Sequence, residues 1–165
     1  MRGFPTFVVG GFFGIAVGFA IGIFVYPYIF LADVVASEEV VGVETKQIIA
    51  AGAFIHANPS DPIHYGSGAV TVYDDTVRLE QDFEVGPGPK YHVYLVPSGD
   101  VTSSSVVQNS MFIDLGRLRA FKGSQNFPVP GGVDLRDYGT VVIWCEQFDV
   151  LISPAKLDFR ETSSG

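Results

Sequence analysis

The chain has 165 residues, of which 18 are acidic and 10 are basic, and its formal net charge is −8. Arg2 is the only charged residue among the first 32, so the rest of the chain has nine basic and 18 acidic residues, a net charge of −9. A surface this acidic repels the phosphates of nucleic acids and the head groups of anionic lipids, which argues against both as binding partners.

The N-terminal segment is the most apolar part of the chain. Residues 3–32 form an unbroken stretch of 30 uncharged residues. Because about 20 apolar residues in a helix cross the hydrocarbon core of a bilayer, this stretch predicts a transmembrane helix over residues 7–31. Arg2 precedes the stretch and acidic residues follow it, so the positive-inside rule places residues 1–6 in the cytoplasm and the rest of the chain outside, in the periplasm of a Gram-negative cell. The length of the apolar stretch favours an uncleaved single-pass anchor over a cleaved signal peptide.

Glycines recur every four residues within this apolar segment, at Gly10, Gly14, Gly18 and Gly22. On a helix they form one smooth stripe, which permits the close approach of a second helix. The stripe therefore suggests a homo-oligomer or a membrane-protein partner. Glycine is also common in transmembrane helices without such pairing, so both interpretations stay open.

The composition changes twice after the apolar segment. Residues 32–50 combine glutamates with valines and are expected to form a stalk. Between residues 51 and 158, short apolar segments alternate with Gly, Pro, Asp, Asn and Ser, which is typical of an all-β protein. We expect a small antiparallel β-sandwich or barrel-like domain there, followed by a disordered tail over residues 159–165.

The expected strands follow the apolar segments of this domain. They cover residues 51–56, 66–73, 77–83, 91–96, 112–118, 140–148 and 149–157. The expected connections are a hairpin turn at 73–76, a mobile polar loop at 98–109, a turn at 123–126 and one helical turn at 134–138.

The last long strand is the most apolar one. Side chains alternate between the two faces of a strand, so Val141, Ile143 and Cys145 share one face while Val142 and Trp144 share the other. Because both faces are apolar, we expect this strand to be central in the sheet, with Cys145 inside the domain and Trp144 packed in the core.

Cys145 is the only cysteine of the chain, so it cannot form an intramolecular disulfide. Proteins outside the cytoplasm usually pair their cysteines, which makes a lone thiol there unusual. A reactive thiol needs a nearby cation or metal to lower its pKa, whereas the neighbouring Glu146 and Asp149 would raise that pKa. Two interpretations therefore stay open: an inert buried side chain, or a redox or metal-binding thiol.

The chain has three histidines, His56, His64 and His92, which are candidates for a thiolate–imidazole metal site with Cys145. A blue-copper site is disfavoured because neither His nor Met follows the cysteine. Haem attached through paired cysteines is excluded for a chain with one cysteine. A haem bound without covalent bonds, or a metal, stays open, and His64 in a glycine-rich loop and His92 on a strand are the candidate ligands.

A series of short motifs occurs in a fixed order along the β region. The motifs are Gly52-Ala53-Phe54, His64-Tyr65-Gly66-Ser67-Gly68, Gly86-Pro87 before Tyr91-His92-Val93-Tyr94-Leu95, Asp114-Leu115-Gly116-Arg117-Leu118, Gly123-Ser124-Gln125-Asn126-Phe127, Val141-Val142-Ile143-Trp144-Cys145 and Ala155-Lys156-Leu157. Over about residues 50–158 this order resembles the DM-thirteen electron-transfer family, whose domains are often found beside DOMON domains. The chain departs from the family at Gly88, where an acid is usual, and at Ser153-Pro154, where Phe-Gly is frequent.

The resemblance implies a β-sandwich-like fold and a redox role for the family's cysteine, which is Cys145 here. Because Trp144 stands directly beside Cys145, it is a candidate electron relay. Together with the apolar segment, it suggests a membrane-anchored bacterial module that exchanges electrons with a redox partner protein. The chain shows no other catalytic motif. The alternative is therefore a non-catalytic binding or adhesion module that presents the loops 57–65 and 98–110.

Overall fold

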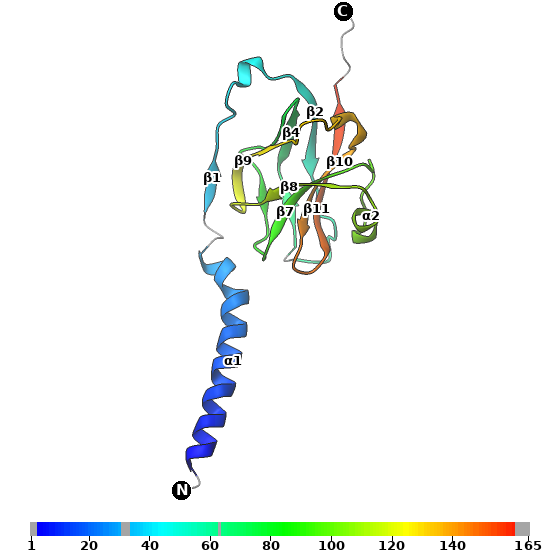
Figure 1. Cartoon of the computed structure of the whole chain (residues 1–165). Coiled ribbons are helices and arrows are strands. Elements are labelled where there is room, and N and C mark those ends of the chain that lie inside the picture. Colours follow the sequence, from blue (N-terminus) through cyan, green and yellow to red (C-terminus); the bar gives the residue numbers. More distant parts are fainter. Residues whose placement is uncertain (1–2, 31–33, 63, 161–165) are drawn as a thin grey trace, which may run out of the picture.

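The computed structural model describes residues 3–30, 34–62 and 64–160. A long helix, α1 (Gly3–Phe30), precedes a domain of mostly antiparallel β structure (Figure 1). The expectation of an all-β domain is thus confirmed. Residues 1–2 of the expected cytoplasmic segment and residues 161–165 of the expected tail lie outside the described residues.

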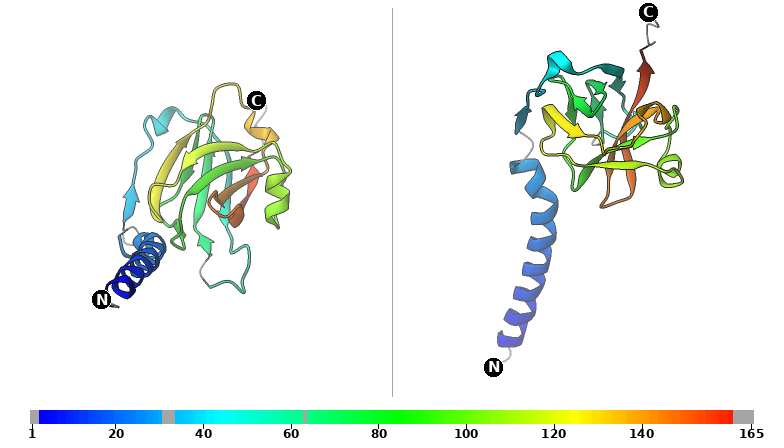
Figure 2. Two further views of the ribbon diagram at one scale, coloured as in Figure 1. Left: turned by 60° about the horizontal axis from the view of Figure 1, so that its bottom comes forward. Right: turned by 45° about the horizontal axis from the view of Figure 1, so that its top comes forward.

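The strands of the β domain form one continuous hydrogen-bonded system. They are β1 (Val35–Ser37), β2 (Ile48–Phe54), β3 (Gly66–Ser67), β4 (Ala69–Tyr73), β5 (Thr76–Leu79), β6 (Glu84–Val85), β7 (Tyr91–Val96), β8 (Ile113–Arg117), β9 (Lys122–Pro128), β10 (Thr140–Cys145) and β11 (Val150–Phe159). Their order is β3-β6-β9-β5-β4-β2-β11-β10-β7-β8, and β1 pairs with β9 in parallel. Because β8 also contacts β9, the sheet curls over a common core, as Figure 2 shows.

Several expected elements are present. The strand over residues 91–96 is β7, and β4 and β5 form the expected antiparallel hairpin. The expected helical turn is the 3₁₀ helix η2 (Leu135–Asp137), whose start is capped by the Asp134 side chain accepting from the Arg136 N–H. The expected mobile loop over 98–109 contains a short helix, α2 (Ser104–Gln108).

The turn expected at 123–126 is wrong, because these residues lie inside β9. Gly123 has a φ of 85°, a backbone conformation that side chains disfavour. A Cβ at this position would lie 2.0 Å from the backbone oxygen of Ala36 in β1. The glycine is thus required for the close approach of β1 to β9, and not for a chain reversal.

Residues 34–50 form part of the domain, so the expected stalk is not seen in this described segment. They contribute β1, a 3₁₀ helix η1 (Val43–Thr45) and the start of β2. Glu38 fixes the segment: its carboxylate accepts from Arg119 Nε at 2.8 Å, from Arg119 Nη2 at 2.9 Å and from the Asn126 backbone N–H at 2.9 Å. These partners lie far along the chain, so the sequence of the segment gives no sign of them. Its composition alone is therefore like that of a linker.

Both faces of β10 are buried, as expected for a central strand, and β10 lies between β7 and β11. Val141, Ile143 and Cys145 point into the main core. Val142 and Trp144 point into a smaller core on the other face, which residues of α2 cover. The face assignment made from period-two alternation is confirmed.

The described side chains of α1 are exposed, and they include Phe7, Phe12 and Phe13. A Cβ placed on any glycine of the stripe would meet no atom within 4 Å. Within the described residues, no helix combines the length and the apolar character that crossing a membrane requires. The transmembrane helix expected over residues 7–31 is therefore not confirmed, and pairing through the glycine stripe stays a prediction.

The Glu38 contacts predict a measurable contribution to stability. Burial raises the pKa of Glu38, but the bonds from Arg119 and Asn126 outweigh this effect and lower the pKa below its ordinary value of 4.5. The stabilisation is thus present above pH 4.5 and is lost as the pH falls through the lower pKa of the folded state. Glu38→Gln should lower the free energy of unfolding at pH 7 by about 1 kcal/mol, since the pair is partly exposed.

Urea unfolding at pH 7 and at acid pH, followed by the fluorescence of Trp144, measures this effect. The difference between Glu38→Gln and the wild type should shrink at acid pH. Glu39→Gln is the matched control because Glu39 is the exposed neighbour. Equal losses of stability for the two variants would contradict the assignment.

Candidate functional site

The register between β7 and β10 decides which candidate residues lie together. Trp144 lies opposite His92, and Cys145 lies opposite Tyr91. Directly opposite residues in antiparallel strands point to the same face of a sheet. Cys145 and His92 therefore lie on opposite faces, and the thiolate–imidazole site considered from the sequence does not form between them.

Cys145 is a fully buried free thiol in the main core. Its S–H donates to the carbonyl oxygen of Pro89, with 3.3 Å between sulfur and oxygen. Burial raises the pKa of Cys145, an effect that the hydrogen bonds from the backbone of Phe148 and Gln147 do not cancel. The thiol is therefore protonated at neutral pH, and its burial keeps it from bulky reagents.

This burial predicts a slow reaction with thiol reagents. In the native chain at pH 7, an aromatic disulfide reagent should modify Cys145 much more slowly than in denaturant, where one thiol per chain should react at once. Absorbance of the released thiolate measures both rates. Rapid and complete modification of the native chain at pH 7 would contradict the buried, protonated thiol.

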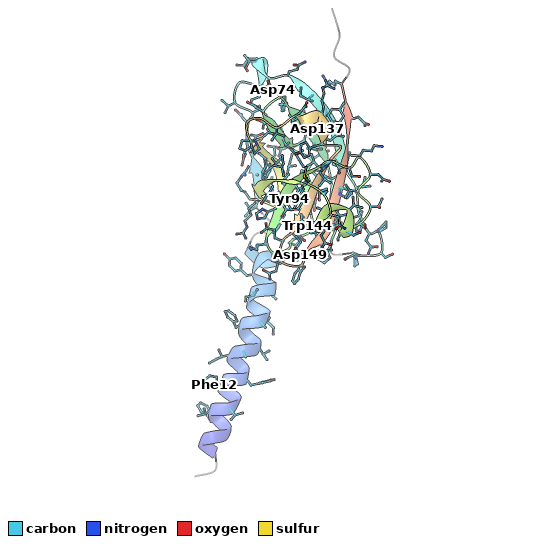
Figure 3. The ribbon with its side chains drawn as sticks, turned by 45° about the vertical axis from the view of Figure 1, so that its right-hand side comes forward. Phe12, Asp74, Tyr94, Asp137, Trp144 and Asp149 are labelled. Carbon is cyan, nitrogen blue, oxygen red and sulfur yellow. The ribbon has the colours of Figure 1, made fainter. Side chains whose placement is uncertain are left out.

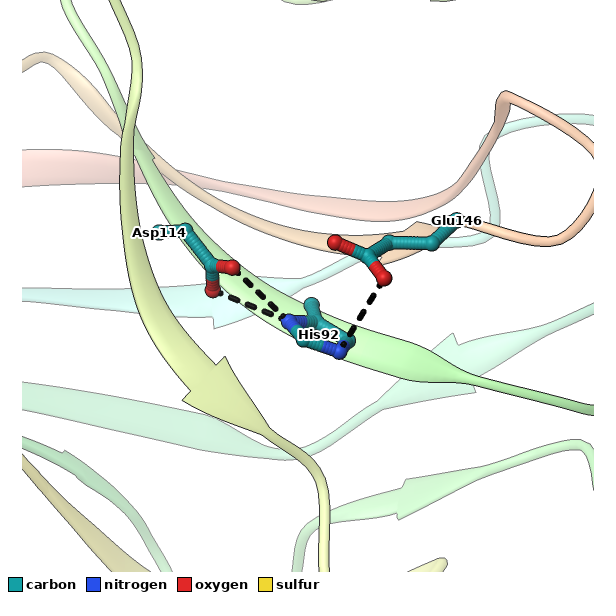
Figure 4. A group of neighbouring side chains, drawn as sticks. All are labelled: His92, Asp114 and Glu146. Carbon is teal, nitrogen blue, oxygen red and sulfur yellow. Dashed lines mark hydrogen bonds and ion pairs between the residues drawn. The ribbon is translucent and has the colours of Figure 1, made fainter.

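The opposite face holds a cluster of three ionisable side chains, His92 on β7, Asp114 on β8 and Glu146 directly after β10 (Figure 4). His92 Nδ1 lies 3.0 and 2.9 Å from the two carboxylate oxygens of Asp114. His92 Nε2 lies 3.4 Å from Glu146 Oε2. Among the described residues, this is the only group of three or more potential metal ligands.

Sequence reasoning identified His92 but missed its two carboxylate partners. Two strands pair with β7, the strand of His92. Asp114 lies on one of them, β8, and Glu146 comes directly after the other, β10. A signal was present in the sequence, because Glu146 shares the alternation of Trp144 and lies where the strand becomes polar. Only the strand register shows that Trp144 is opposite His92, and therefore that Glu146 is near its ring.

A cavity of about 410 Å³ lies beside the cluster. Its lining comprises Lys90, Tyr94, Gln108, Phe112, Trp144, Glu146 and Asp149. Charged and aromatic side chains thus meet at one opening of the domain. The cavity gives a small molecule or a partner side chain access to this face of the sheet.

Tyr94 connects the cavity with the core. Its ring stacks on Phe112 with centroids 4.4 Å apart and on Trp144 with centroids 6.1 Å apart. Figure 3 shows Tyr94 and Trp144 close together at one end of the domain. The Tyr94 hydroxyl donates to Glu146 Oε1 at 3.3 Å. Burial, together with the charges of Asp114 and Glu146, raises the pKa of Tyr94, so the phenol is protonated at neutral pH.

His64 has a different environment. Its Nδ1 lies 2.7 Å from Asp61 Oδ2 within the same loop, and its side chain is partly exposed. The ring of His56 lies edge-on to Tyr65, with centroids 6.5 Å apart. Within the described residues, neither histidine belongs to a group of three potential metal ligands. A cofactor-binding role for His64 stays a prediction.

Comparison with known proteins gives one match. A family model described as electron transfer DM13 matches residues 60–157, which is more than half of the chain. The matched region includes Cys145, Trp144 and the three residues of the cluster. No curated protein and no solved structure matches the chain.

Proposed function

The chain belongs to the electron transfer DM13 family, and on this premise we propose that its β domain passes single electrons between a partner protein and the buried Cys145. The observation that carries the proposal is a continuous series of oxidisable side chains. Trp144 is the chain neighbour of Cys145, and its ring stacks on Tyr94. Tyr94 in turn lines the cavity at the surface.

The environment of Cys145 favours electron transfer over thiol–disulfide exchange. Exchange requires a thiolate that attacks a disulfide sulfur in direct contact. Cys145 is fully buried, and burial raises its pKa, so neither condition is met in the folded domain. Electron transfer through neighbouring aromatic rings requires no such contact.

The proposed route balances protons as well as electrons. A one-electron acceptor at the cavity takes an electron from Tyr94, whose phenolic proton moves to Glu146 along the existing hydrogen bond. Cys145 then loses one electron, which passes through Trp144 to Tyr94. Its thiol proton passes to water at the exposed turn over residues 147–149, whose backbone hydrogen-bonds the sulfur. Tyr94 takes its proton back from Glu146, so the net change is the oxidation of Cys145 to a thiyl radical. Reduction by a partner reverses each step.

We propose in addition that the N-terminal segment attaches the domain to a membrane from outside the cytoplasm. Support comes from the long uncharged stretch of the sequence and from the exposed apolar side chains of α1, such as Phe7 and Phe12. Such side chains are unfavourable in water and are stabilised in an apolar environment. Attachment would hold the acidic domain close to membrane-bound electron carriers.

The electron route is tested by oxidation of the chain with hexachloroiridate(IV), a one-electron acceptor, in a stopped-flow instrument. Tyr94→Phe removes the proton-coupled step and should slow the consumption of the oxidant by about tenfold or more, which corresponds to about 1.4 kcal/mol in the barrier. Cys145→Ser should reduce the number of electrons that the oxidant takes from each chain. Tyr73→Phe is the control, because Tyr73 is buried outside the route. If Tyr94→Phe and Tyr73→Phe react alike, the route is wrong.

Membrane attachment is tested by fractionation of cells that express the full-length chain. We expect the chain in the membrane pellet, where it should resist extraction with alkaline carbonate. A variant without residues 1–33 should appear in the soluble fraction. Release of the full-length chain by carbonate would contradict attachment by the apolar segment.

A further inference from the structure

We propose that His92 and Glu146 form a binding site for a divalent first-row transition metal, with Asp114 as the positioning residue. The site lies on the face of the sheet opposite to Cys145 and shares Glu146 with the electron route proposed above. Three features support the site: the spacing of the potential ligand atoms, the contacts that orient His92 and the adjacent cavity.

The spacing between His92 and Glu146 fits a shared metal ion. His92 Nε2 and Glu146 Oε2 are 3.4 Å apart. Two ligand atoms that each lie about 2.1 Å from a tetrahedral metal ion are about 3.4 Å from each other. A charge-assisted hydrogen bond between nitrogen and oxygen is shorter, about 2.7–2.9 Å. The observed separation therefore matches an edge of a coordination shell better than a direct bond.

Asp114 holds the histidine ring in the orientation that metal binding needs. Its Oδ1 accepts from the backbone N–H of Gly116 at 2.8 Å, and both of its oxygens face His92 Nδ1. In a neutral imidazole, a carboxylate that accepts from Nδ1–H leaves Nε2 unprotonated and able to bind a metal. Carboxylate, histidine and metal in this order recur in protein metal sites.

The surroundings supply the remaining requirements of a metal site. The cavity beside Glu146 leaves room for water or a small ligand to complete the coordination shell. The Tyr94 hydroxyl bonds the other oxygen of Glu146 and fixes the carboxylate. Lys90 Nζ lies 3.6 Å from Glu146 Oε2, but its side chain is half exposed and free to turn into solvent when a cation binds. One imidazole and one carboxylate favour zinc, cobalt, manganese or iron in the divalent state.

The competing interpretation is an ion-pair cluster without metal, in which a protonated His92 donates to both carboxylates. Titration of the metal-free full-length chain with Co²⁺, followed by visible absorption, distinguishes the two, because a bound Co²⁺ ion gains a ligand-field spectrum. Titration calorimetry with Zn²⁺ measures the affinity on the same sample. We expect about one equivalent of metal per chain.

The variants assign the ligands. His92→Gln and Glu146→Gln should each abolish the Co²⁺ spectrum and weaken Zn²⁺ binding by about 100-fold or more, whereas Asp114→Asn should weaken it by about 10–100-fold. Glu84→Gln is the matched control for Glu146→Gln, because Glu84 also accepts from a tyrosine hydroxyl and pairs with a lysine, but among the described residues it belongs to no group of three potential metal ligands. It should leave binding unchanged.

Two results would overturn the site: less than half an equivalent of metal on the wild-type chain, or equal losses of affinity in Glu84→Gln and Glu146→Gln. Circular dichroism confirms that each variant is folded. If His92→Gln fails to fold, Glu146→Gln at the partly exposed end of β10 provides the same test. Because the spectrum and the calorimetry do not depend on electron transfer, failure of the site leaves the electron route untouched.

Discussion

The antiparallel pairing of β7 with β10 is the constraint on which the rest of the structure depends. It places Cys145 opposite Tyr91 in the main core and Trp144 opposite His92 on the other face. A shift of this register by one residue would exchange the two faces, moving the thiol to the side of the smaller core and His92 toward the main core. The strands β8 and β11 flank this pair, so the register determines the positions of Cys145, Trp144, His92 and Asp114.

The two faces of the sheet at β7 and β10 therefore differ in chemistry. On the core face, the thiol is buried and protonated, and no cation of the described residues lowers its pKa. On the other face, an aromatic stack and Glu146 line a cavity, and His92 and Asp114 lie beside Glu146. Trp144 joins the two, since it follows the alternation of the outer face while being bonded in the chain to Cys145. The electron route that we propose therefore crosses the sheet through the backbone of β10 and not through a shared cavity.

The sequence predicted the features that depend on residues close together in the chain. Alternation along residues 141–145 predicted the faces of β10, and the polar turn at residues 73–76 predicted the hairpin of β4 and β5. It did not predict contacts set by distant pairing. Gly123 resembled a turn residue because the approach of β1 is invisible in sequence, and Glu38 resembled part of a linker because its partner Arg119 is remote. Asp114 and Glu146 were missed for the same reason.

The central claim, that electrons move between the cavity and Cys145 through Trp144 and Tyr94, is tested most directly by electron paramagnetic resonance. The full-length chain is oxidised with one equivalent of a one-electron oxidant and frozen at successive times. A tyrosyl signal should appear and then decay in the wild type as Cys145 re-reduces Tyr94, and it should persist longer in Cys145→Ser. An identical decay in both chains, or a tyrosyl signal that survives in Tyr94→Phe, would contradict the account.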